Sequence, residues 1–387
     1  MREVAVVGVG MTSFGKSQKS NIEMFSEAAM DAIADAGLKP RDIQSLFLGN
    51  VLGGFEEGQI GMAAFAAADI GLPNIPATRV EGICASGALA VREAFIWVAS
   101  GAYDIVMAGG TERALVMGTS YATRTFQMGS DSRYESGTGV TFPAVFAMAA
   151  NLYAQKYGIP LAKLKEQMAM VAVKNHKHGV HNPKAQFRKE ITVENVLSGM
   201  VVCDPLQLYD CCPFSDGAAA IILASAEVAK KLAAKPVYIA GVGQASAGPL
   251  HNQKDITRFK AREVSAKAAY DMAGLKPEDV DVCELHDCFT IAEIIAMEGL
   301  GFFEFGKGSE AVEKRETTYG GKITVNPSGG LKAKGHPIGA TGVAQVYEIV
   351  KQLRGEAGER QVEGAKVGMT DTLGGDACTI ANIILRA

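Results

Sequence analysis

A strong charge of either sign is missing from this chain of 387 residues. Its 38 Lys and Arg residues are nearly balanced by 42 Asp and Glu residues, for a net charge of −4. Neither nucleic acid nor an anionic membrane surface is therefore expected as a partner. The longest stretch without a charged residue, 136–155, contains Pro143, Asn151 and several Gly and Thr residues. It predicts a loop that leads into a buried helix, not a membrane span.

A disulfide framework is also missing. The seven cysteines are an odd number without regular spacing, and Cys211 and Cys212, which are adjacent, are expected to be packing residues. Free thiols are typical of a reducing compartment. The N-terminus enters an apolar, strand-like segment at once, without the pattern of a signal peptide. These features predict a cytoplasmic protein.

Two cofactor motifs are incomplete. The run 4–10 ends in Gly-Val-Gly, but position 13 is Ser, so the G-x-G-x-x-G pattern of dinucleotide-binding proteins fails. Cys283, His286 and Cys288 are residue types that bind zinc, but no second pair at suitable spacing accompanies them. The sequence therefore predicts neither a metal nor a nicotinamide or flavin cofactor.

Strand-like and helix-like segments alternate in the first part of the chain. Apolar runs at 4–10, 45–50 and 104–110 are typical of buried strands. The segment 23–36 has the pattern of an amphipathic helix and is followed by Gly37. This alternation predicts a layered α/β domain.

The pattern then recurs. Residues 235–243 resemble the opening strand, and Ala273-Gly-Leu-Lys-Pro277 repeats Ala36-Gly-Leu-Lys-Pro40 letter for letter. In both copies a helix-like segment precedes the pentapeptide and a strand-like segment follows it, which indicates a duplication. We therefore predict an N-terminal half formed by 1–112 and 201–232, an inserted loop domain at 113–200, and a C-terminal half at 235–387.

Cys84 lies between a predicted strand at 77–80 and a predicted helix at 85–100 that is buried nearly all round. Free N–H groups and the helix dipole favour negative charge at this position. The thiol is therefore expected to lose its proton easily and to act as a nucleophile. Taken alone, a buried and inert cysteine is the better interpretation, and the rest of the chain reverses that preference.

The second half supplies two histidines. His286 lies two residues before Cys288 at the end of a predicted strand, which would direct both side chains to the same side. His336 precedes Pro337, which suits the first turn of a helix. By the duplication this junction matches that of Cys84, so two facing halves would form a Cys/His pair that activates a nucleophile. A further group, His176, His178 and His181, is expected to form a solvated basic face.

Four segments resemble those of thiolases, in this order: the Cys84 turn, His-Asp-Cys-Phe at 286–289, Gly-His-Pro-Ile-Gly-Ala-Thr-Gly at 335–342, and the terminal Gly-Gly turn. With the duplicated halves, the resemblance covers the whole chain. Within the family the chain is similar to the sterol-carrier-protein type and to archaeal-type acetyl-CoA acetyltransferases. Many other thiolases have Asn-Glu-Ala-Phe at the second segment and a cysteine where this chain has Thr372. Cys288 is the available replacement for that cysteine.

The resemblance implies a five-layer αβαβα thiolase fold with the loop domain over the coenzyme A site. It implies acyl exchange between a 3-oxoacyl-CoA and CoA plus a shorter acyl-CoA, in either direction, without a metal or redox cofactor. His336 would deprotonate Cys84, and the N–H groups of Cys84 and Gly374 would hold the oxyanion of the acyl-enzyme. His286 and His336 would stabilise the enolate, and Cys288 would move the proton on the α-carbon.

The resemblance also implies a homodimer or dimer of dimers built across the first-half sheets, and a small zinc-ribbon and OB-fold partner protein. Two alternatives stay open: a non-catalytic acyl-CoA-binding or scaffold subunit, and an irreversible ketoacyl-synthase-like condensing enzyme. The segment 118–142 is expected to shape the acyl pocket. Acetoacetyl, longer and aromatic 3-oxoacyl groups all fit it, so lipid and aromatic acid metabolism are both compatible.

Overall fold

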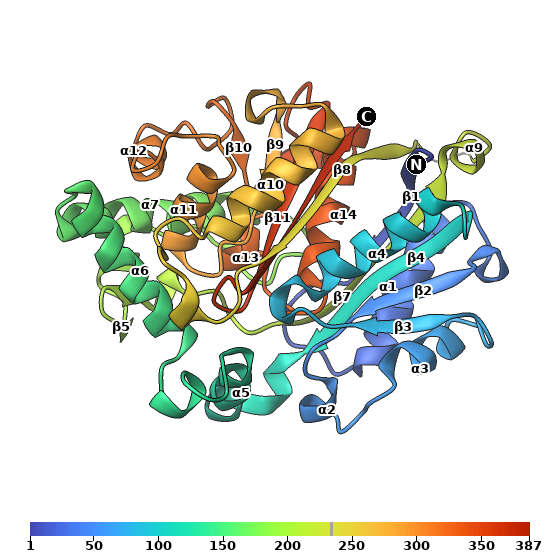
Figure 1. Ribbon diagram of the computed structural model, residues 1–387, viewed down its shortest axis with the longest axis horizontal. Coiled ribbons are helices and arrows are strands. Elements are labelled where there is room, and N and C mark those ends of the chain that lie inside the picture. The colour runs from blue at the N-terminus through green and yellow to red at the C-terminus, as the bar shows by residue number, and fades with distance from the viewer. Residues whose placement is uncertain (233–234) are drawn as a thin grey trace.

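The computed structural model describes residues 1–232 and 235–387 (Figure 1). Its centre is a mixed ten-stranded sheet in the order β10-β9-β11-β12-β8-β1-β7-β4-β2-β3. The N-terminal half contributes β1 (Val4–Met11), β2 (Ser45–Gly49), β3 (Ala77–Val80), β4 (Ile105–Arg113) and β7 (Asp216–Ser225). The C-terminal half contributes β8 (Val237–Ser246), β9 (Val282–Glu284), β10 (Thr324–Val325), β11 (Val367–Gly374) and β12 (Thr379–Arg386).

The strand order is the same in both halves. β1-β7-β4-β2-β3 corresponds to β8-β12-β11-β9-β10. In each half the central short strand pairs in parallel with both neighbours, whereas the longer strands pair antiparallel. The halves meet where Ala5 lies opposite Tyr238 and Val6 lies opposite Val237. The predicted duplication is therefore present in the topology.

The repeated pentapeptide marks the same turn in both halves. It follows α1 (Asn21–Asp35) in one half and begins at the last residue of α10 (Lys260–Ala273) in the other. Gly37 and Gly274 both have a φ of +66°, a conformation in which a Cβ atom is disfavoured. A short 3₁₀ turn follows each of them, at Pro40–Asp42 and Pro277–Asp279.

Helices form three layers around the two halves of the sheet. α4 (Ser86–Ser100) and α14 (Thr341–Arg354) lie between the halves and share one apolar core with both. α1 and α3 (Met62–Asp69) cover the outer face of the N-terminal strands, and α10 and α11 (Thr290–Gly299) cover that of the C-terminal strands. This is the expected αβαβα arrangement. The segment Ile83–Ser100 has the length and apolar composition of a membrane span, but most of it is buried in this core.

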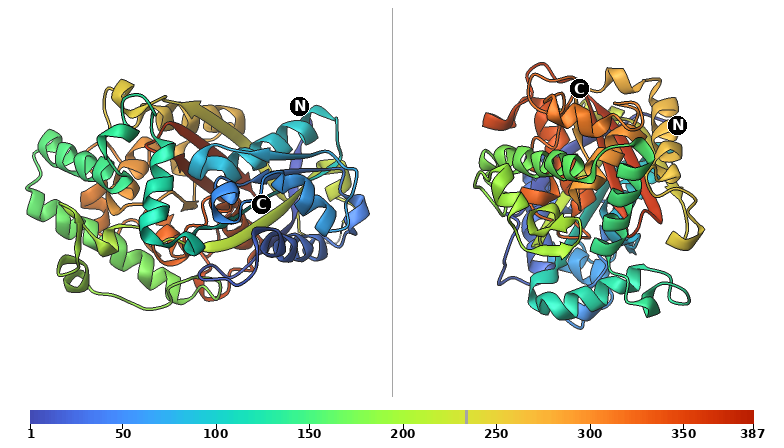
Figure 2. Two further views of the ribbon diagram at one scale, coloured as in Figure 1. Left: turned by 90° about the horizontal axis from the view of Figure 1, so that it is seen from below. Right: turned by 90° about the vertical axis from the view of Figure 1, so that its left-hand side faces the viewer.

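Between β4 and β7 the chain leaves the sheet and forms a mostly helical region. It contains α5 (Gly118–Phe126), α6 (Phe142–Tyr157), α7 (Leu161–Val180), α8 (Val193–Leu197) and the hairpin of β5 (Val201–Cys203) and β6 (Leu206–Gln207). α6 and α7 pack on the C-terminal half (Figures 1 and 2). The remaining short helices are α2 (Gly53–Glu56), α9 (Ala226–Ala229), α12 (Gly308–Glu313) and α13 (Gly330–Ala333).

Two predicted element boundaries are wrong. β9 ends at Glu284, so His286 and Cys288 lie in the connection to α11 and not at the end of a strand. α14 begins at Thr341, so Pro337 belongs to a turn before the helix. The first boundary differs because the polar residues after β9 continue its sequence pattern without its backbone hydrogen bonds, and the second because Pro337 suits the turn before a helix as well as a first helical turn.

The expectation of a solvated histidine face is also wrong. His176 and His178 are only 5% and 2% exposed, because α7 lies on the C-terminal half. His178 donates from Nδ1 to the carbonyl oxygen of Asn326 (3.0 Å) and accepts at Nε2 from the hydroxyl of Thr318 (2.9 Å). Only His181 lies at the surface, beside Glu359.

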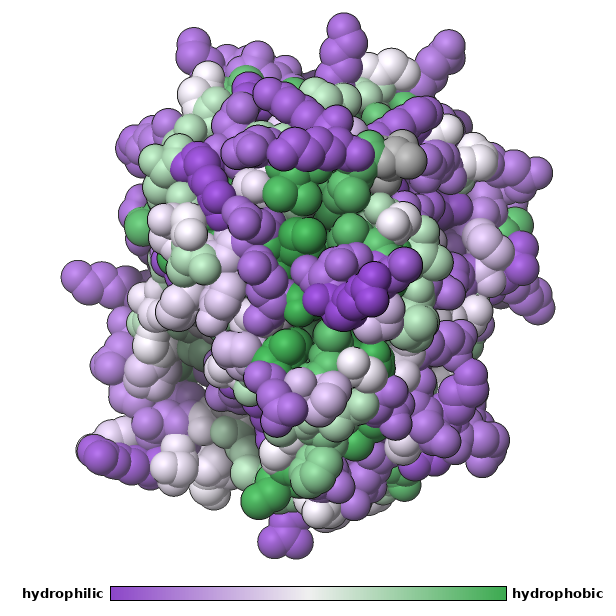
Figure 3. Space-filling view, turned by 90° about the vertical axis from the view of Figure 1, so that its right-hand side faces the viewer, coloured by the Kyte–Doolittle hydropathy of each residue, from purple (hydrophilic) through white to green (hydrophobic). Residues whose placement is uncertain are grey.

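One face of the molecule carries an apolar band. On the side formed by the right-hand edge of Figure 1, apolar side chains gather through the middle of the face, with hydrophilic side chains around them (Figure 3). Contiguous apolar surface rimmed by polar residues is typical of interaction sites.

Candidate active site

Cys84 lies in a tight turn between β3 and α4. A single 3₁₀ turn, Ile83–Ala85, precedes the helix, and Ile83 has a φ of +51°, which a branched side chain rarely adopts. Ser86 stabilises the turn, because its hydroxyl accepts from the N–H of Gly82 (2.9 Å) and donates to the carbonyl oxygen of Ile83 (2.6 Å). Strained backbone of this kind is concentrated at functional sites.

Three side chains meet at this turn. The sulfur of Cys84 and one ring nitrogen each of His286 and His336 all lie within 4.8 Å of one another. The two imidazoles are nearly perpendicular, with ring centroids 4.9 Å apart and an interplanar angle of 86°. The structure therefore brings together the predicted nucleophile and both predicted histidines, which are separated by about half of the chain.

The hydrogen bonds of His336 define its tautomer. The hydroxyl of Thr341 donates to the carbonyl oxygen of Pro337 (2.9 Å), so its oxygen accepts the hydrogen bond with Nδ1 of His336 (2.7 Å). Nδ1 must then carry the proton, and Nε2 presents a lone pair. A neutral imidazole with a free Nε2 beside a thiol is a general base in position.

His286 has no hydrogen-bond partner for either ring nitrogen among the described residues, although it is fully buried. Burial, with His336 and two buried cations adding, holds the pKa of His286 well below its ordinary value. Burial and then the charge of Lys332 lower the pKa of His336 to about 3. Both imidazoles are therefore neutral near pH 7 and keep a nitrogen available for a ligand.

The thiol of Cys84 does not behave as its position at a helix start suggested. Protein atoms surround it, and this loss of hydration raises its pKa to about 12, although the N–H of Gly375 has the opposite effect. The expected lowering of this pKa by the helix N-terminus is therefore wrong. A neutral thiol beside a neutral imidazole indicates that proton transfer accompanies the attack on the substrate.

Cys288 lies near Cys84 in the same site. Cys84 and Cys212 both contribute to the environment of its thiol, whose pKa burial raises well above its ordinary value. Its carbonyl oxygen accepts from the N–H of Cys212 (2.9 Å). Cys212, expected to be a packing residue, therefore lies next to the reactive thiols.

Thr372 makes a structural contact at the position where the sequence resemblance implies a cysteine. Its hydroxyl donates to Oε1 of Gln345 (2.5 Å), whose amide in turn donates to the carbonyl oxygen of Asp371 (2.9 Å). This arrangement ties the end of β11 to α14. The predicted oxyanion residue Gly374 ends β11, and it is the N–H of the next residue, Gly375, that points to the sulfur of Cys84.

Close backbone contacts hold α4 against α14. A Cβ atom at Gly87 would lie 2.6 Å from the carbonyl oxygen of Gly339, and one at Gly342 would lie 2.3 Å from the backbone nitrogen of Ala88. Both distances are far inside van der Waals contact, so only glycine fits. These two glycines let the helix starts that carry Cys84 and His336 approach each other.

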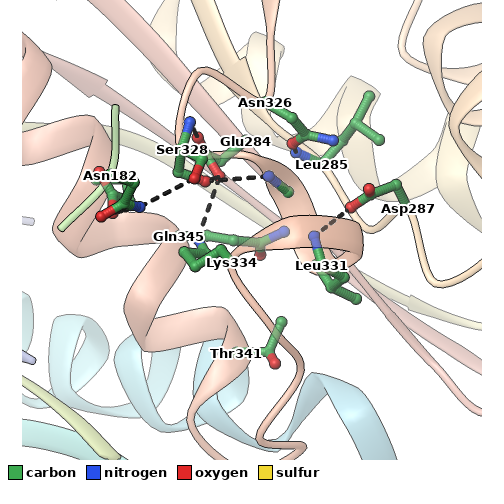
Figure 4. A network of polar contacts seen from close by, with 12 residues as sticks. Asn182, Glu284, Leu285, Asp287, Asn326, Ser328, Leu331, Lys334, Thr341 and Gln345 are labelled. Carbon is green, nitrogen blue, oxygen red and sulfur yellow. Dashed lines mark hydrogen bonds and ion pairs between the residues drawn. The ribbon is translucent and has the colours of Figure 1, made fainter. Parts of the chain in front are cut away.

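A polar network fixes the segment that carries His286 and Cys288 (Figure 4). Asp287, between them, accepts from the N–H of Leu331 (2.7 Å) and from the amide of Asn175 on α7 (2.8 Å). Asn326 accepts from the N–H of Leu285 (2.8 Å). Sequence reasoning missed these positioning residues, because their partners lie far away along the chain.

A second part of the same network lies behind this segment (Figure 4). Glu284 accepts from both the N–H (3.0 Å) and the hydroxyl (2.6 Å) of Ser328, and its other neighbour is the ammonium of Lys334 (3.3 Å). Asn182 donates to the carbonyl oxygen of Ser328 (2.9 Å). The loop between β10 and His336 is therefore held from three sides.

The predicted pocket segment reaches the site. A Cβ atom at Gly375 would lie 2.8 Å from Cδ1 of Ile83 and 3.3 Å from the carbonyl oxygen of Gly129. Gly129 in turn lies against the ring of Phe142. Gly129 therefore borders the turn that holds Cys84, and Phe142 lies beside Gly129.

A metal ion could also be considered for the three side chains, since thiolate and imidazole both bind zinc. Cys283, which the sequence pattern suggested as a ligand, is buried on β9 and is not in this group. A cation bound by Cys84 would occupy the lone pair that an acyl-transfer nucleophile needs. The arrangement therefore fits nucleophilic catalysis by the thiol better than metal binding.

Comparisons with known proteins agree with this geometry. Residues 4–227 match the model of the thiolase N-terminal domain, and residues 243–387 match that of the thiolase C-terminal domain-like family. An acetyl-CoA acetyltransferase of Methanothermobacter thermautotrophicus is 47% identical over 98% of both chains. Sterol carrier protein 2 of Oryctolagus cuniculus is 39% identical over 96% of this chain and 70% of its own. The solved Ltp2-ChsH2(DUF35) aldolase has a TM-score of 0.83 and 26% identity, and the match covers 100% of this chain and 98% of that one.

Proposed function

This chain belongs to the thiolase family, and on that premise we propose that it transfers acetyl groups through an acyl-enzyme on Cys84. Family membership makes it an acyltransferase that acts on 3-oxoacyl-CoA substrates. The single observation that carries the proposal is the meeting of the Cys84 sulfur with the ring nitrogens of His286 and His336 within 4.8 Å. Coenzyme A and acyl-CoA act as substrates, and the chemistry requires no metal or redox cofactor.

In the first half-reaction Nε2 of His336 takes the proton of Cys84 while the sulfur attacks the carbonyl carbon of the acyl donor. The carbonyl electron pair moves to oxygen, and N–H groups at the Cys84 turn and at Gly374–Gly375 hold that oxyanion. When the tetrahedral intermediate collapses, the CoA thiolate or the enolate leaves and receives a proton. Acylated Cys84 remains.

In the second half-reaction of condensation an acetyl-CoA lies with its thioester oxygen between His286 and His336. A ring N–H of His286 donates to the enolate oxygen, as does Nε2 of His336 while it holds a proton, and Cys288 removes the α-proton. The α-carbon then attacks the acyl group on Cys84, so a carbon–carbon bond forms and the thiol is released. Thiolysis is the same sequence in reverse.

Acetyl-CoA is proposed as the acyl donor because the relative with 47% identity is named an acetyl-CoA acetyltransferase. A thiolysis panel tests this, with CoA consumption measured against acetoacetyl-CoA, a medium-chain and an aromatic 3-oxoacyl-CoA. We expect the highest kcat/KM with acetoacetyl-CoA. A higher value with a long or aromatic substrate would contradict the proposed acyl group. Absence of thiolysis with every substrate would instead favour a carrier or scaffold.

A homodimer is proposed, formed through the edge of the sheet in the N-terminal half. β3 is the last strand of the order and pairs with β2 alone, and Trp97 on α4 is 41% exposed. A small zinc-ribbon and OB-fold partner is also proposed, since the name of one structural neighbour includes a DUF35 protein. Free thiols throughout support a reducing cytoplasmic location.

A further inference from the structure

Lys332 and Lys334 are both only 1% exposed, but their partners differ. Nζ of Lys334 lies 3.3 Å from a carboxylate oxygen of Glu284. Nζ of Lys332 makes no ion pair with any described residue. It donates instead to the backbone carbonyl oxygens of Asp210 and Cys288, the latter at 3.2 Å. Lys332 is therefore a buried ammonium group that has only neutral acceptors.

The carboxylates of the surrounding segments are engaged elsewhere. Asp210 accepts from the hydroxyl of Thr290 (2.6 Å) and the N–H of Gln207 (2.9 Å). Asp287 accepts from Leu331 and Asn175, as described above. Removing a charge from water without a counter-ion costs stability, and carbonyl dipoles offset only part of that cost. No described carboxylate is therefore paired directly with Lys332, although its charge offsets part of the rise that burial causes in the pKa of Asp287.

Lys332 lies beside the segment that carries the thiol of Cys288. Its ammonium contacts the backbone of Cys288 and lies 5.7 Å from the ring centroid of the next residue, Phe289. The charges with the largest effect on the thiol of Cys288 belong to Cys84, Cys212, Asp287 and Lys332. Among these, Lys332 is the one that favours a negative charge on this sulfur.

We propose that Lys332 supplies the fixed positive charge that stabilises the thiolate form of Cys288 during proton transfer. This inference rests on the acid/base role proposed above for Cys288. In condensation the thiolate takes the α-proton of acetyl-CoA: an S–H bond forms, and the electron pair of the broken C–H bond becomes the enolate. In thiolysis the thiol returns this proton to the enolate carbon. Negative charge is thus shared between the sulfur and the enolate oxygen, and Lys332 lies on the sulfur side.

The test is Lys332→Gln, which keeps N–H donors for the two carbonyls but removes the charge. Iodoacetamide alkylation of Cys288 is followed against pH in the full chain, and peptide mass mapping reports that cysteine alone. The alkylation rate follows the fraction of Cys288 that is thiolate. We therefore expect the midpoint of the plot of alkylation rate against pH to rise by about one pH unit, and the alkylation rate at pH 8 to fall roughly tenfold. Because the charge of Lys332 also lowers the pKa of His336, acetylation of Cys84 by acetyl-CoA is measured separately, and its rate is expected to change less than the alkylation rate of Cys288.

Two further variants complete the test. Lys332→Arg keeps the charge and is expected to leave the midpoint within about half a pH unit of the wild type. Lys267→Gln, which removes an exposed lysine on α10, is the surface control. An unchanged midpoint in Lys332→Gln overturns the proposal. A midpoint shifted by a full pH unit in Lys332→Arg also overturns it, and this second measurement does not depend on whether the Gln variant folds. A shifted midpoint together with normal turnover of Cys288→Ala would refute the role of Cys288 and leave the effect of Lys332 intact.

Discussion

Helices α4 and α14 occupy matching places in the two halves, but their surroundings differ. The first ten residues of α14 are all buried, because strands of both halves and α4 enclose it. α4 is buried only through Val91 without interruption, and Arg92, Glu93 and Trp97 then reach the surface. The expectation that α4 is buried nearly all round is therefore only partly correct. α14 is therefore enclosed by the chain itself, whereas the exposed face of α4 is the one that we propose as the dimer interface.

The two halves also supply different chemistry. The N-terminal half contributes the proposed nucleophile, Cys84, whereas the C-terminal half contributes both imidazoles and Cys288. The two thiols are surrounded differently as well. Apart from burial, Cys378 and Glu112 raise the pKa of Cys84, whereas the buried charge of Lys332 lies beside Cys288. A nucleophile that its base deprotonates during the attack needs no fixed positive charge beside it. A thiol that takes up and returns a proton benefits from such a charge, because the charge stabilises its thiolate form.

The largest effect is expected from Cys84→Ser, which removes the contribution of the N-terminal half. A serine hydroxyl is a far weaker acid than a thiol, so thiolysis should fall by at least roughly 10⁴, as in other enzymes that lose their nucleophile. Brief treatment of the wild type with acetyl-CoA, followed by peptide mapping, should place the acetyl group on Cys84. An acetyl group found on Cys288, with Cys84 unmodified, would refute the assignment.

Cys288→Ala separates the two thiols. The hydroxyl of Thr372 is tied to Gln345 and is far too weak an acid to replace the cysteine that the sequence resemblance implies at this position. Acetylation of Cys84 should survive, while condensation and thiolysis should each fall by roughly 10²–10⁴, the usual contribution of a general acid/base. Single-turnover acetylation and steady-state thiolysis of the same sample are the two measurements. Near-normal thiolysis would identify Cys288 as a packing residue and assign the proton to an ordered water.

Trp97→Glu tests whether the exposed face of α4 is an interface. The ring centroid of Trp97 lies 6.4 Å from that of Phe47 and 5.6 Å from that of Tyr103, and Trp97 remains 41% exposed. A charge there should weaken dimerisation about 100-fold, since tryptophan is a frequent anchor of interfaces. Sedimentation equilibrium measures the dissociation constant. Met272→Glu on α10, also an exposed apolar residue, is the control and should leave it unchanged. A wild type that is monomeric at micromolar concentration would contradict the dimer.

The smallest effect is expected from Thr341→Val, which acts on the start of α14. The valine cannot accept from Nδ1 of His336, so the tautomer with a free Nε2 loses its preference. One hydrogen bond is worth about 1 kcal/mol, and kcat should therefore fall roughly fivefold. Thr341→Ser keeps the hydroxyl and should retain activity. Equal losses in Val and Ser would show that the methyl group, not the hydrogen bond, matters.

Much of the fold could be predicted from local patterns. The apolar runs of β1 and β2 and the repeated pentapeptide after α1 and α10 depend on contacts within a few residues, so their positions were predicted nearly correctly. The position of the His286–Cys288 segment was not predicted correctly. A polar stretch after a short strand has no periodicity that shows where the hydrogen bonds of the strand end. The burial of His178 was missed for a similar reason, since it depends on α7 packing against a half of the chain that begins far downstream.

The sequence by itself determined which reactive groups exist and in which segments they lie: Cys84 at a helix start, His336 before another, and His286 with Cys288 between them. Only the tertiary structure decided their protonation. Burial raises the pKa of Cys84 although its helix start favours the thiolate, because desolvation of a charge outweighs a helix dipole. Likewise, the free nitrogen of His336 depends on Thr341 and the charge beside Cys288 depends on Lys332. Hydration, hydrogen-bond partners and neighbouring charges are properties of a packed interior, which segments form only when they meet.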